Sequence, residues 1–97
     1  MIGMVTINVK TETDTARGWV FCVDLEDGDE THSFDVSLSW PDYDHWSHGR
    51  VAPERVVMAA FEFLLKREPI SSIMPKFDCA VIRRYFNDVD AELPKML

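Results

Sequence analysis

The chain has 97 residues, a formal net charge of −7, and 46% hydrophobic and 11% aromatic residues. This length and hydrophobic content predict one folded domain, residues 1–97, and exclude a disordered chain. The two cysteines, Cys22 and Cys79, each lie inside an apolar pattern, which favours buried reduced thiols over a disulfide. No signal-peptide pattern is present, and no apolar run reaches the roughly 18 residues of a membrane span. We therefore expect a cytoplasmic protein.

The acidic residues are concentrated in the first half of the chain. Residues 1–50 carry three basic and ten acidic side chains, whereas residues 51–97 carry seven of each. An acidic surface repels phosphate backbones, so we expect no nucleic-acid partner. The excess charge serves solubility, or alternatively attracts a basic partner or a cation.

Two stretches near the start alternate apolar and polar residues, which is typical of half-buried strands. The first covers residues 5–10, with Ile2 as its earliest start, and the polar residues 11–17 after it are expected to form a loop. The second begins at Gly18. Its strongly apolar face consists of Trp19, Phe21, Val23 and Leu25.

A third strand is predicted after the Asp27-Gly28 pair, which is a strong hairpin signal because glycine accepts positive φ without steric cost. This strand has the strictest alternation in the chain, with a polar face that is expected to be solvated. Its apolar face consists of His32, Phe34, Val36, Leu38 and Trp40. The pattern predicts an antiparallel sheet that is covered by helices on one face only.

A short helix is expected next, capped by Ser39 or Trp40 with Pro41 in its first turn. It contains the densest set of possible metal ligands, which are Asp42, Asp44, His45 and His48. Two carboxylates and two imidazoles suit zinc or another divalent metal. The alternative is that the aspartates stabilise the positive end of the helix. The aromatic residues here form either a binding patch or a cap over the open end of the core; they are Trp40, Tyr43 and Trp46.

The strongest feature of the sequence is a helix predicted over Pro53–Glu68. Its polar stripe is narrow and consists of Arg55, Ala59, Glu62 and Lys66. The remaining residues form an apolar arc of roughly 220°, about twice that of an ordinary surface helix. We therefore expect this helix to be covered from two sides, by the sheet and another helix or by a second chain.

The end of the chain predicts a short turn over residues 71–75 and a last helix from Cys79 to about Val89, capped by Asp78. Its buried stripe is expected to contain Val81, Ile82, Tyr85 and Val89. Arg83 and Arg84 would face solvent, and residues 95–97 would form a loose tail.

From Thr31 onward the sequence resembles a group of small bacterial proteins of unknown function. The shared features are Thr31-His32, the aromatic turn 40–46, the Pro53–Val57 segment, the F-x-F-L-L-x-R-E-P pattern at 61–69, Ile73 to Asp78, and Tyr85-Phe86. The resemblance implies a bacterial, cytoplasmic, single-domain protein. It implies no activity or site.

The polar Arg67-Glu68-Pro69 segment closes an otherwise apolar stretch. One explanation is helix termination, because basic residues suit the negative end of a helix and proline stops it. The alternative is an ion pair from Arg67 or Glu68 to the last helix, or a corner that binds a partner.

We predict an α+β fold, with a three-stranded antiparallel sheet and two main helices on one face in the order β-β-β-α-α. No nucleophile motif, activated cysteine or glycine-rich phosphate loop is present, so we predict no catalytic residues and no cofactor. The expected function is protein–protein interaction by a small acidic protein, including a homodimer through the central helix or the sheet edge. The alternative is a ligand- or metal-binding module that uses residues 40–48 together with His32. A membrane partner is not expected.

Overall fold

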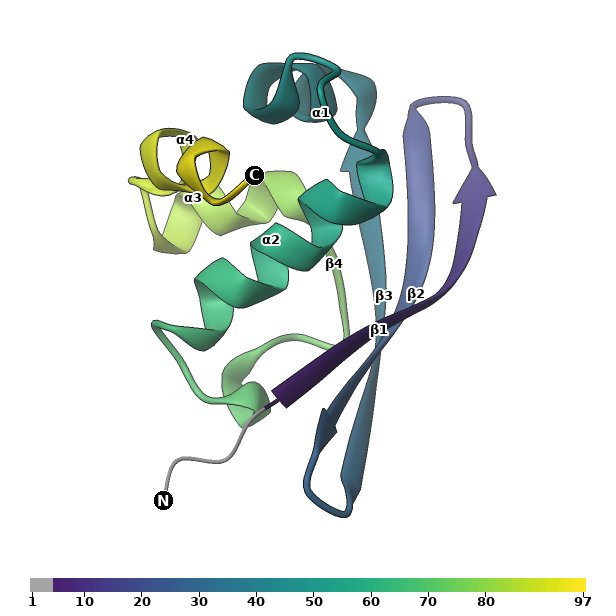
Figure 1. Ribbon diagram of the computed structural model, residues 1–97, viewed down its shortest axis with the longest axis vertical. Coiled ribbons are helices and arrows are strands. Elements are labelled where there is room, and N and C mark those ends of the chain that lie inside the picture. Colours follow the sequence, from purple (N-terminus) through teal and green to yellow (C-terminus); the bar gives the residue numbers. More distant parts are fainter. Residues whose placement is uncertain (1–4) are drawn as a thin grey trace.

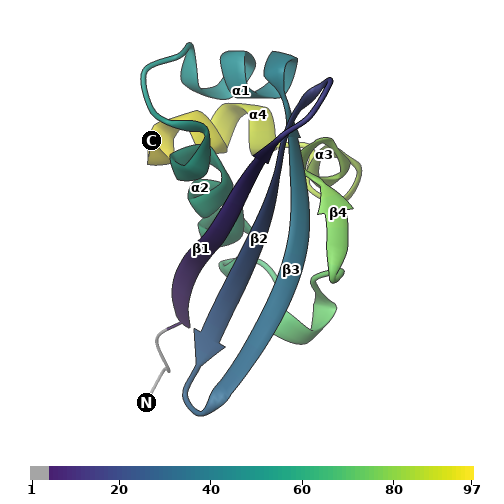
Figure 2. The ribbon, with the colours of Figure 1, turned by 90° about the vertical axis from the view of Figure 1, so that its right-hand side faces the viewer.

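The computed structural model describes residues 5–97 and confirms an α+β fold, with helices on one face of a sheet (Figures 1 and 2). The strands of this part of the chain are β1 (Val5–Asp14), β2 (Gly18–Asp27), β3 (Glu30–Ser39) and β4 (Lys76–Asp78). The helices are α1 (Trp40–Ser47), α2 (Pro53–Leu65), α3 (Ile82–Tyr85) and α4 (Val89–Glu92). None of these helices has the length and apolar character that crossing a membrane requires. The strand start predicted near Ile2 lies outside the described residues.

Strands β1, β2 and β3 form the predicted antiparallel meander. The β2–β3 hairpin has a two-residue loop, in which Gly28 adopts a φ of 63° between the paired residues Asp27 and Glu30. The loop predicted at residues 11–17 is wrong, because β1 continues to Asp14 after an irregularity in pairing at Lys10. Backbone pairing with β2 holds this extension although its side chains are exposed, so no apolar alternation marks it in the sequence.

The sheet has a fourth strand that the sequence did not predict. Strand β4 pairs in parallel with β3, which gives the order β1-β2-β3-β4 and corrects the predicted three-stranded sheet. Parallel neighbours require a long crossover connection, and here α1 and α2 lie in that connection. With three residues, of which only Phe77 is buried, β4 is too short to show a period-two pattern.

Helix α2 lies between the sheet and the C-terminal segment, as its wide apolar arc predicted (Figure 1). Phe61 and Phe63 are fully buried, and a single chain provides both covers. The predicted polar stripe is wrong at Ala59, which is also fully buried, because the C-terminal segment packs against this side of the helix. Arg55 stays near the surface and donates from Nη2 to the carbonyl oxygen of Met96 at 2.6 Å.

The last predicted helix is broken. Cys79–Val81 is a 3-10 turn, α3 follows it, and Phe86 leaves the helix with φ −137° and ψ 90° before α4 begins. The break leaves Tyr85 66% exposed, so its predicted place in the buried stripe is wrong, and it lets Val89 reach the core. The predicted loose tail is also wrong, because Leu93–Met96 forms a 3-10 turn packed on the core.

We expect the start of β2 to tolerate no side chain. A Cβ added at Gly18 would overlap the carbonyl oxygen of Leu38 and lie 2.9 Å from the Cα atom of Ser39. Gly18→Ala should therefore lower the free energy of unfolding by about 3 kcal/mol, as overpacking against backbone does. Urea unfolding measures this loss.

Gly28→Ala is the matched control, since its φ is positive but nothing lies within 4 Å of the added Cβ. It should cost only about 1 kcal/mol. Equal losses in the two variants would contradict the steric explanation.

Candidate functional site

The predicted aromatic patch on α1 is not assembled. Trp46 is buried in the core, and Tyr43 packs edge-on against Trp19 with ring centroids 5.2 Å apart. The Tyr43 hydroxyl donates to the carbonyl oxygen of Val51 at 2.5 Å. Trp40, expected on the apolar face of β3, instead begins α1 and is 52% exposed. Two of the three aromatic residues therefore serve the core.

Arg83, which was expected to face solvent, joins α1 to α3 and α4. Its Nη2 atom lies 2.7 Å from Oδ1 of Asp42, and its Nε atom is 2.9 Å from both carboxylate oxygens of Asp90. The buried Trp46 donates from Nε1 to Oδ1 of Asp90 at 2.7 Å. The guanidinium carbon of Arg83 lies over the Trp46 ring, 5.1 Å from the ring centroid. Sequence reasoning missed this network because its partners are 41 to 44 residues apart or on separate short helices.

The charges in this network reinforce one another. The hydrogen bond from Arg83 lowers the pKa of Asp90 below its usual value, and the Trp46 N–H adds to this effect. The same bond with Asp90, followed by that with Asp42, raises the pKa of Arg83. Arg83 and Asp90 therefore stay charged over the physiological range, and their contacts with α1 hold the helices together.

The residues proposed as metal ligands are not brought together. Asp42 is engaged by Arg83, and Nε2 of His45 lies 3.6 Å from Oδ1 of Asp90. His48 caps the end of α1 in the left-handed region with φ 53°. His32 lies near the opposite end of β3 from α1, beside Glu30. In residues 5–97, no three His, Cys, Asp or Glu side chains are placed to hold a metal ion.

Cys79 has no exposed thiol to offer for chemistry. It is fully buried, and burial, with a smaller contribution from Asp78, raises the pKa of its thiol far above the usual value. A thiol in this state is not a nucleophile at neutral pH. Of the predicted caps, Ser39 accepts a hydrogen bond from the Asp42 N–H and Asp78 accepts one from the Ala80 N–H. Ser71, at the start of the turn predicted over residues 71–75, caps no turn, because the turn Ile70–Ser72 begins after Pro69.

An apolar groove lies where α2 ends, between α3, β4 and the segment before β4. Of the three large hydrophobic side chains that are exposed in the described residues, two line it: Met74 at 41% and Tyr85 at 66%. Its floor is formed by the nearly buried Ile73, Phe77 and Ile82. The volume is about 140 Å³, close to that of an apolar cavity that holds one benzene ring.

Arg67 lies behind this groove and contacts Phe63, which packs against the groove residue Phe86. Its guanidinium stacks 3.7 Å from the ring centroid of Phe63, and Nη2 is 2.7 Å from Oδ2 of Asp88, just before α4. Phe86, which lines the groove, packs edge-on against Phe63 with centroids 6.0 Å apart. The predicted ion pair from Arg67 to the C-terminal segment is thus present. Glu68 lines the groove itself.

The Arg83 network predicts a specific pH dependence. Because the folded pKa of Asp90 is lowered, its stabilising contribution is present above the unfolded value of about 4 and is lost as pH falls through the folded pKa. Asp90→Asn should cost about 1 kcal/mol at pH 7, since the carboxylate is partly exposed and screened. The difference from the original chain should shrink between pH 5 and pH 2, roughly, in urea unfolding.

Glu92→Gln, which alters only the exposed pair with Lys95, is the control and should change stability by less than about 0.5 kcal/mol. A deficit of Asp90→Asn that stays constant down to the lowest pH would contradict this role.

Arg67→Ala should lower the free energy of unfolding by about 1–2 kcal/mol, because it removes both the stacking on Phe63 and the pair with Asp88. Arg67→Lys should recover only part, since lysine lacks the planar group that stacks. A double-mutant cycle with Asp88→Ala, followed by urea unfolding, isolates the pair. A loss well below 1 kcal/mol in Arg67→Ala would show that Arg67 only complements the helix end.

Comparison of the chain with protein-family models, curated proteins and solved structures finds no match. The resemblance to small bacterial proteins therefore stays a prediction.

Proposed function

We propose that this protein is a non-catalytic module that binds another protein, and that the groove beside β4 receives an apolar side chain of that partner. One observation carries the proposal: the exposed Met74 and Tyr85 converge on a single groove with an apolar floor. Exposed large apolar side chains that cluster around a hollow are typical of recognition sites.

The dimensions favour a side chain over a free cofactor. Pockets for drug-sized ligands usually measure about 300–1,000 Å³, whereas this groove measures about 140 Å³. It has room for one aromatic or branched side chain, and the remainder of a partner would rest on the exposed rims. Tyr85 and Met74 suit such a rim, because both are common where proteins meet.

The neighbouring strand supports an extended partner. Strand β4 is the last strand of the described sheet and pairs only with β3, so its other side is an edge. An extended segment that lies along such an edge gains backbone hydrogen bonds while an anchor side chain enters the adjacent pocket. We therefore expect the partner segment to be extended, with one large apolar anchor.

The proposal can be tested with a display library of random twelve-residue peptides, selected against the original chain. Selected peptides should contain a large apolar residue, and calorimetry should show at least about tenfold weaker binding to Tyr85→Ser and Met74→Ser, as for an interface hot spot. Stability should change by less than about 0.5 kcal/mol, because both side chains are exposed.

Trp40→Ser is the matched control, since Trp40 is similarly exposed but lies on α1, away from the groove. Selected peptides that bind all three variants as tightly as the original chain would refute the groove as the site. Light scattering on the same variants tests the predicted homodimer: a dimer that Tyr85→Ser abolishes would make the partner a second copy.

A further inference from the structure

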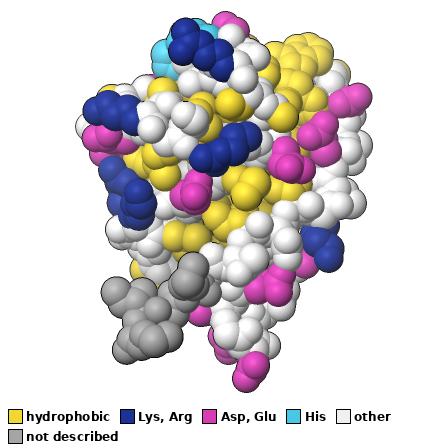
Figure 3. Space-filling model, viewed as in Figure 1, with side chains coloured by type: hydrophobic (Ala, Val, Ile, Leu, Met, Phe, Trp, Pro, Cys, Tyr) yellow, Lys and Arg dark blue, Asp and Glu magenta, His cyan; other side chains and the backbone are white. Residues whose placement is uncertain are grey.

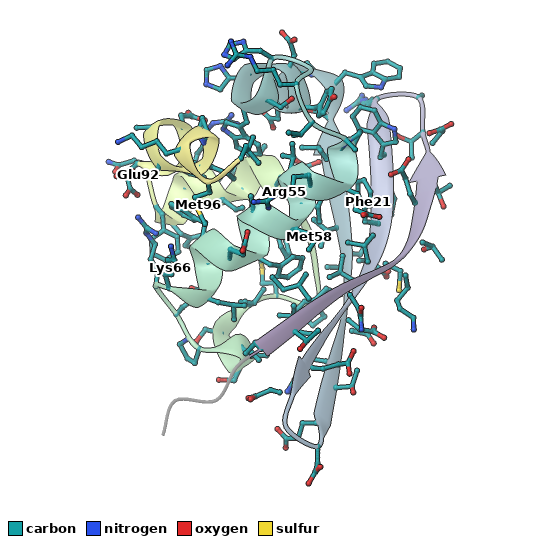
Figure 4. All side chains as sticks on the ribbon, in the orientation of Figure 1. Phe21, Arg55, Met58, Lys66, Glu92 and Met96 are labelled. Carbon is teal, nitrogen blue, oxygen red and sulfur yellow. The ribbon has the colours of Figure 1, made fainter. Side chains whose placement is uncertain are left out.

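A second hollow lies at the opposite edge of the sheet, between β1 and α2. It is broad and shallow, with a volume of about 970 Å³, and shares only Glu68 with the groove beside β4. Figure 3 shows hydrophobic side chains gathered in the middle of this face. In Figure 4, Met58 lies on the side of α2 that faces β1, with Arg55 nearer the start of the helix and Lys66 just past its end.

The floor of this hollow is apolar, and the described residues cover it only in part. β1 contributes Val5 and Ile7, and α2 contributes Met58 and Leu65. All four side chains are only partly buried, and Val5, Ile7 and Leu65 pack against the fully buried core. Met58 and Leu65 belong to the wide apolar arc of α2, on the part that the sheet and the C-terminal segment leave partly exposed.

The rim of the hollow is acidic. Four carboxylates line it, from Asp27, Glu30, Glu62 and Glu68, against a single lysine, Lys66, and His32. Glu62 is paired with Arg55, which leaves the carboxylates of Asp27, Glu30 and Glu68 around the apolar floor. The net charge of the whole chain is −7. The complementary surface therefore has apolar groups at its centre and cations around it.

Strand β1 supplies an open edge beside this floor. It pairs with β2 on one side, and no described strand pairs with its other side. Residues 5–9 precede the irregularity at Lys10 and include no charged residue, so this half lacks the features that usually protect an edge strand from pairing.

From the apolar floor, the acidic rim and the open edge, we propose that this hollow binds an extended basic segment of another protein. The segment would add a strand to β1 along residues 5–9, with alternate apolar side chains on Met58 and Leu65 and Lys or Arg side chains near the rim. A second copy of this chain is disfavoured as the occupant, because two molecules of charge −7 repel each other and would bring acidic rims together. This site shares Glu68 with the proposed groove, but the apolar floors of the two sites have no residue in common.

The test uses two nine-residue probes, one alternating valine with lysine and one alternating valine with glutamate. We expect the lysine probe to bind the original chain at micromolar concentration, with affinity that falls as salt increases, and the glutamate probe not to bind. In NMR spectra, the amide signals of residues 5–9 should shift and become protected from exchange. The proposal would be overturned if the lysine probe did not bind at concentrations up to about 1 mM, which corresponds to a binding free energy of only about −4 kcal/mol.

Two variants separate the parts of the site. The double variant Asp27→Asn, Glu30→Gln removes two exposed rim charges and should weaken the lysine probe about tenfold and reduce its salt dependence. Met58→Glu keeps the acidic character but spoils the floor, and should weaken binding at least as much. Lysine-probe binding that is unchanged in both variants would show attraction to the general acidic surface and overturn the proposed site.

Tyr85→Ser is the matched control, because it alters the groove beside β4 and should leave the lysine probe unaffected. Its loss of selected apolar peptides and retention of the lysine probe would separate the two sites. Light scattering without any probe completes the test: a dimer in which residues 5–9 are protected would assign the hollow to a second copy and overturn the basic partner.

Discussion

The structure depends on the burial of α2 between two layers, and two phenylalanines show how. Residues two apart on a helix point in nearly opposite directions. Phe61 therefore faces the sheet, where its ring lies 5.3 Å from that of Phe34 and 5.8 Å from that of Phe77. Phe63 faces the C-terminal segment, where it contacts Phe86 and carries the guanidinium of Arg67. One helix thus forms the centre of both halves of the core.

The two proposed sites follow from the places where this burial is incomplete. At the C-terminal end of α2, the helix, α3 and β4 do not pack fully against one another, and the small groove with Met74 and Tyr85 lies between them. Along the side that faces β1, Met58 and Leu65 lack a covering layer, and the broad hollow remains. Both sites lie at edge strands of the sheet, since β2 and β3 are paired on both sides.

The sequence predicted the elements whose periodicity is long and regular. The three antiparallel strands, their hairpin at Gly28, the Ser39 cap and the double-sided burial of α2 are all present. The strands and α2 were predicted from their periodicity, because burial imposes it on many successive residues, whereas the hairpin and the cap were predicted from the residue types that turns and helix starts favour. The burial of Ala59 was not predicted, because alanine is common at both exposed and buried positions of helices.

What could not be predicted depends on contacts distant in sequence or on very short elements. Strand β4 has three residues, and α3 and α4 have four each, so no period is long enough to be seen. Arg83 looked like a solvated residue because its acceptors, Asp42 and Asp90, belong to other helices. The groove was missed for a related reason: a continuous last helix would have buried Tyr85, and only the break at Phe86 exposes it.

The distribution of charge favours the edges of the sheet, and not its uncovered face, as the proposed binding sites. The uncovered face carries acidic and hydroxyl side chains that already bond to one another, as Ser33 does to Asp24 and Ser37 to Asp78. Such a face offers little apolar area and repels acidic partners. At the edges, apolar side chains from the helix layer reach the surface beside unpaired backbone, so contact there removes apolar area from water and satisfies hydrogen bonds together. An acidic rim at one edge and a narrow apolar groove at the other would then select partners of different chemistry.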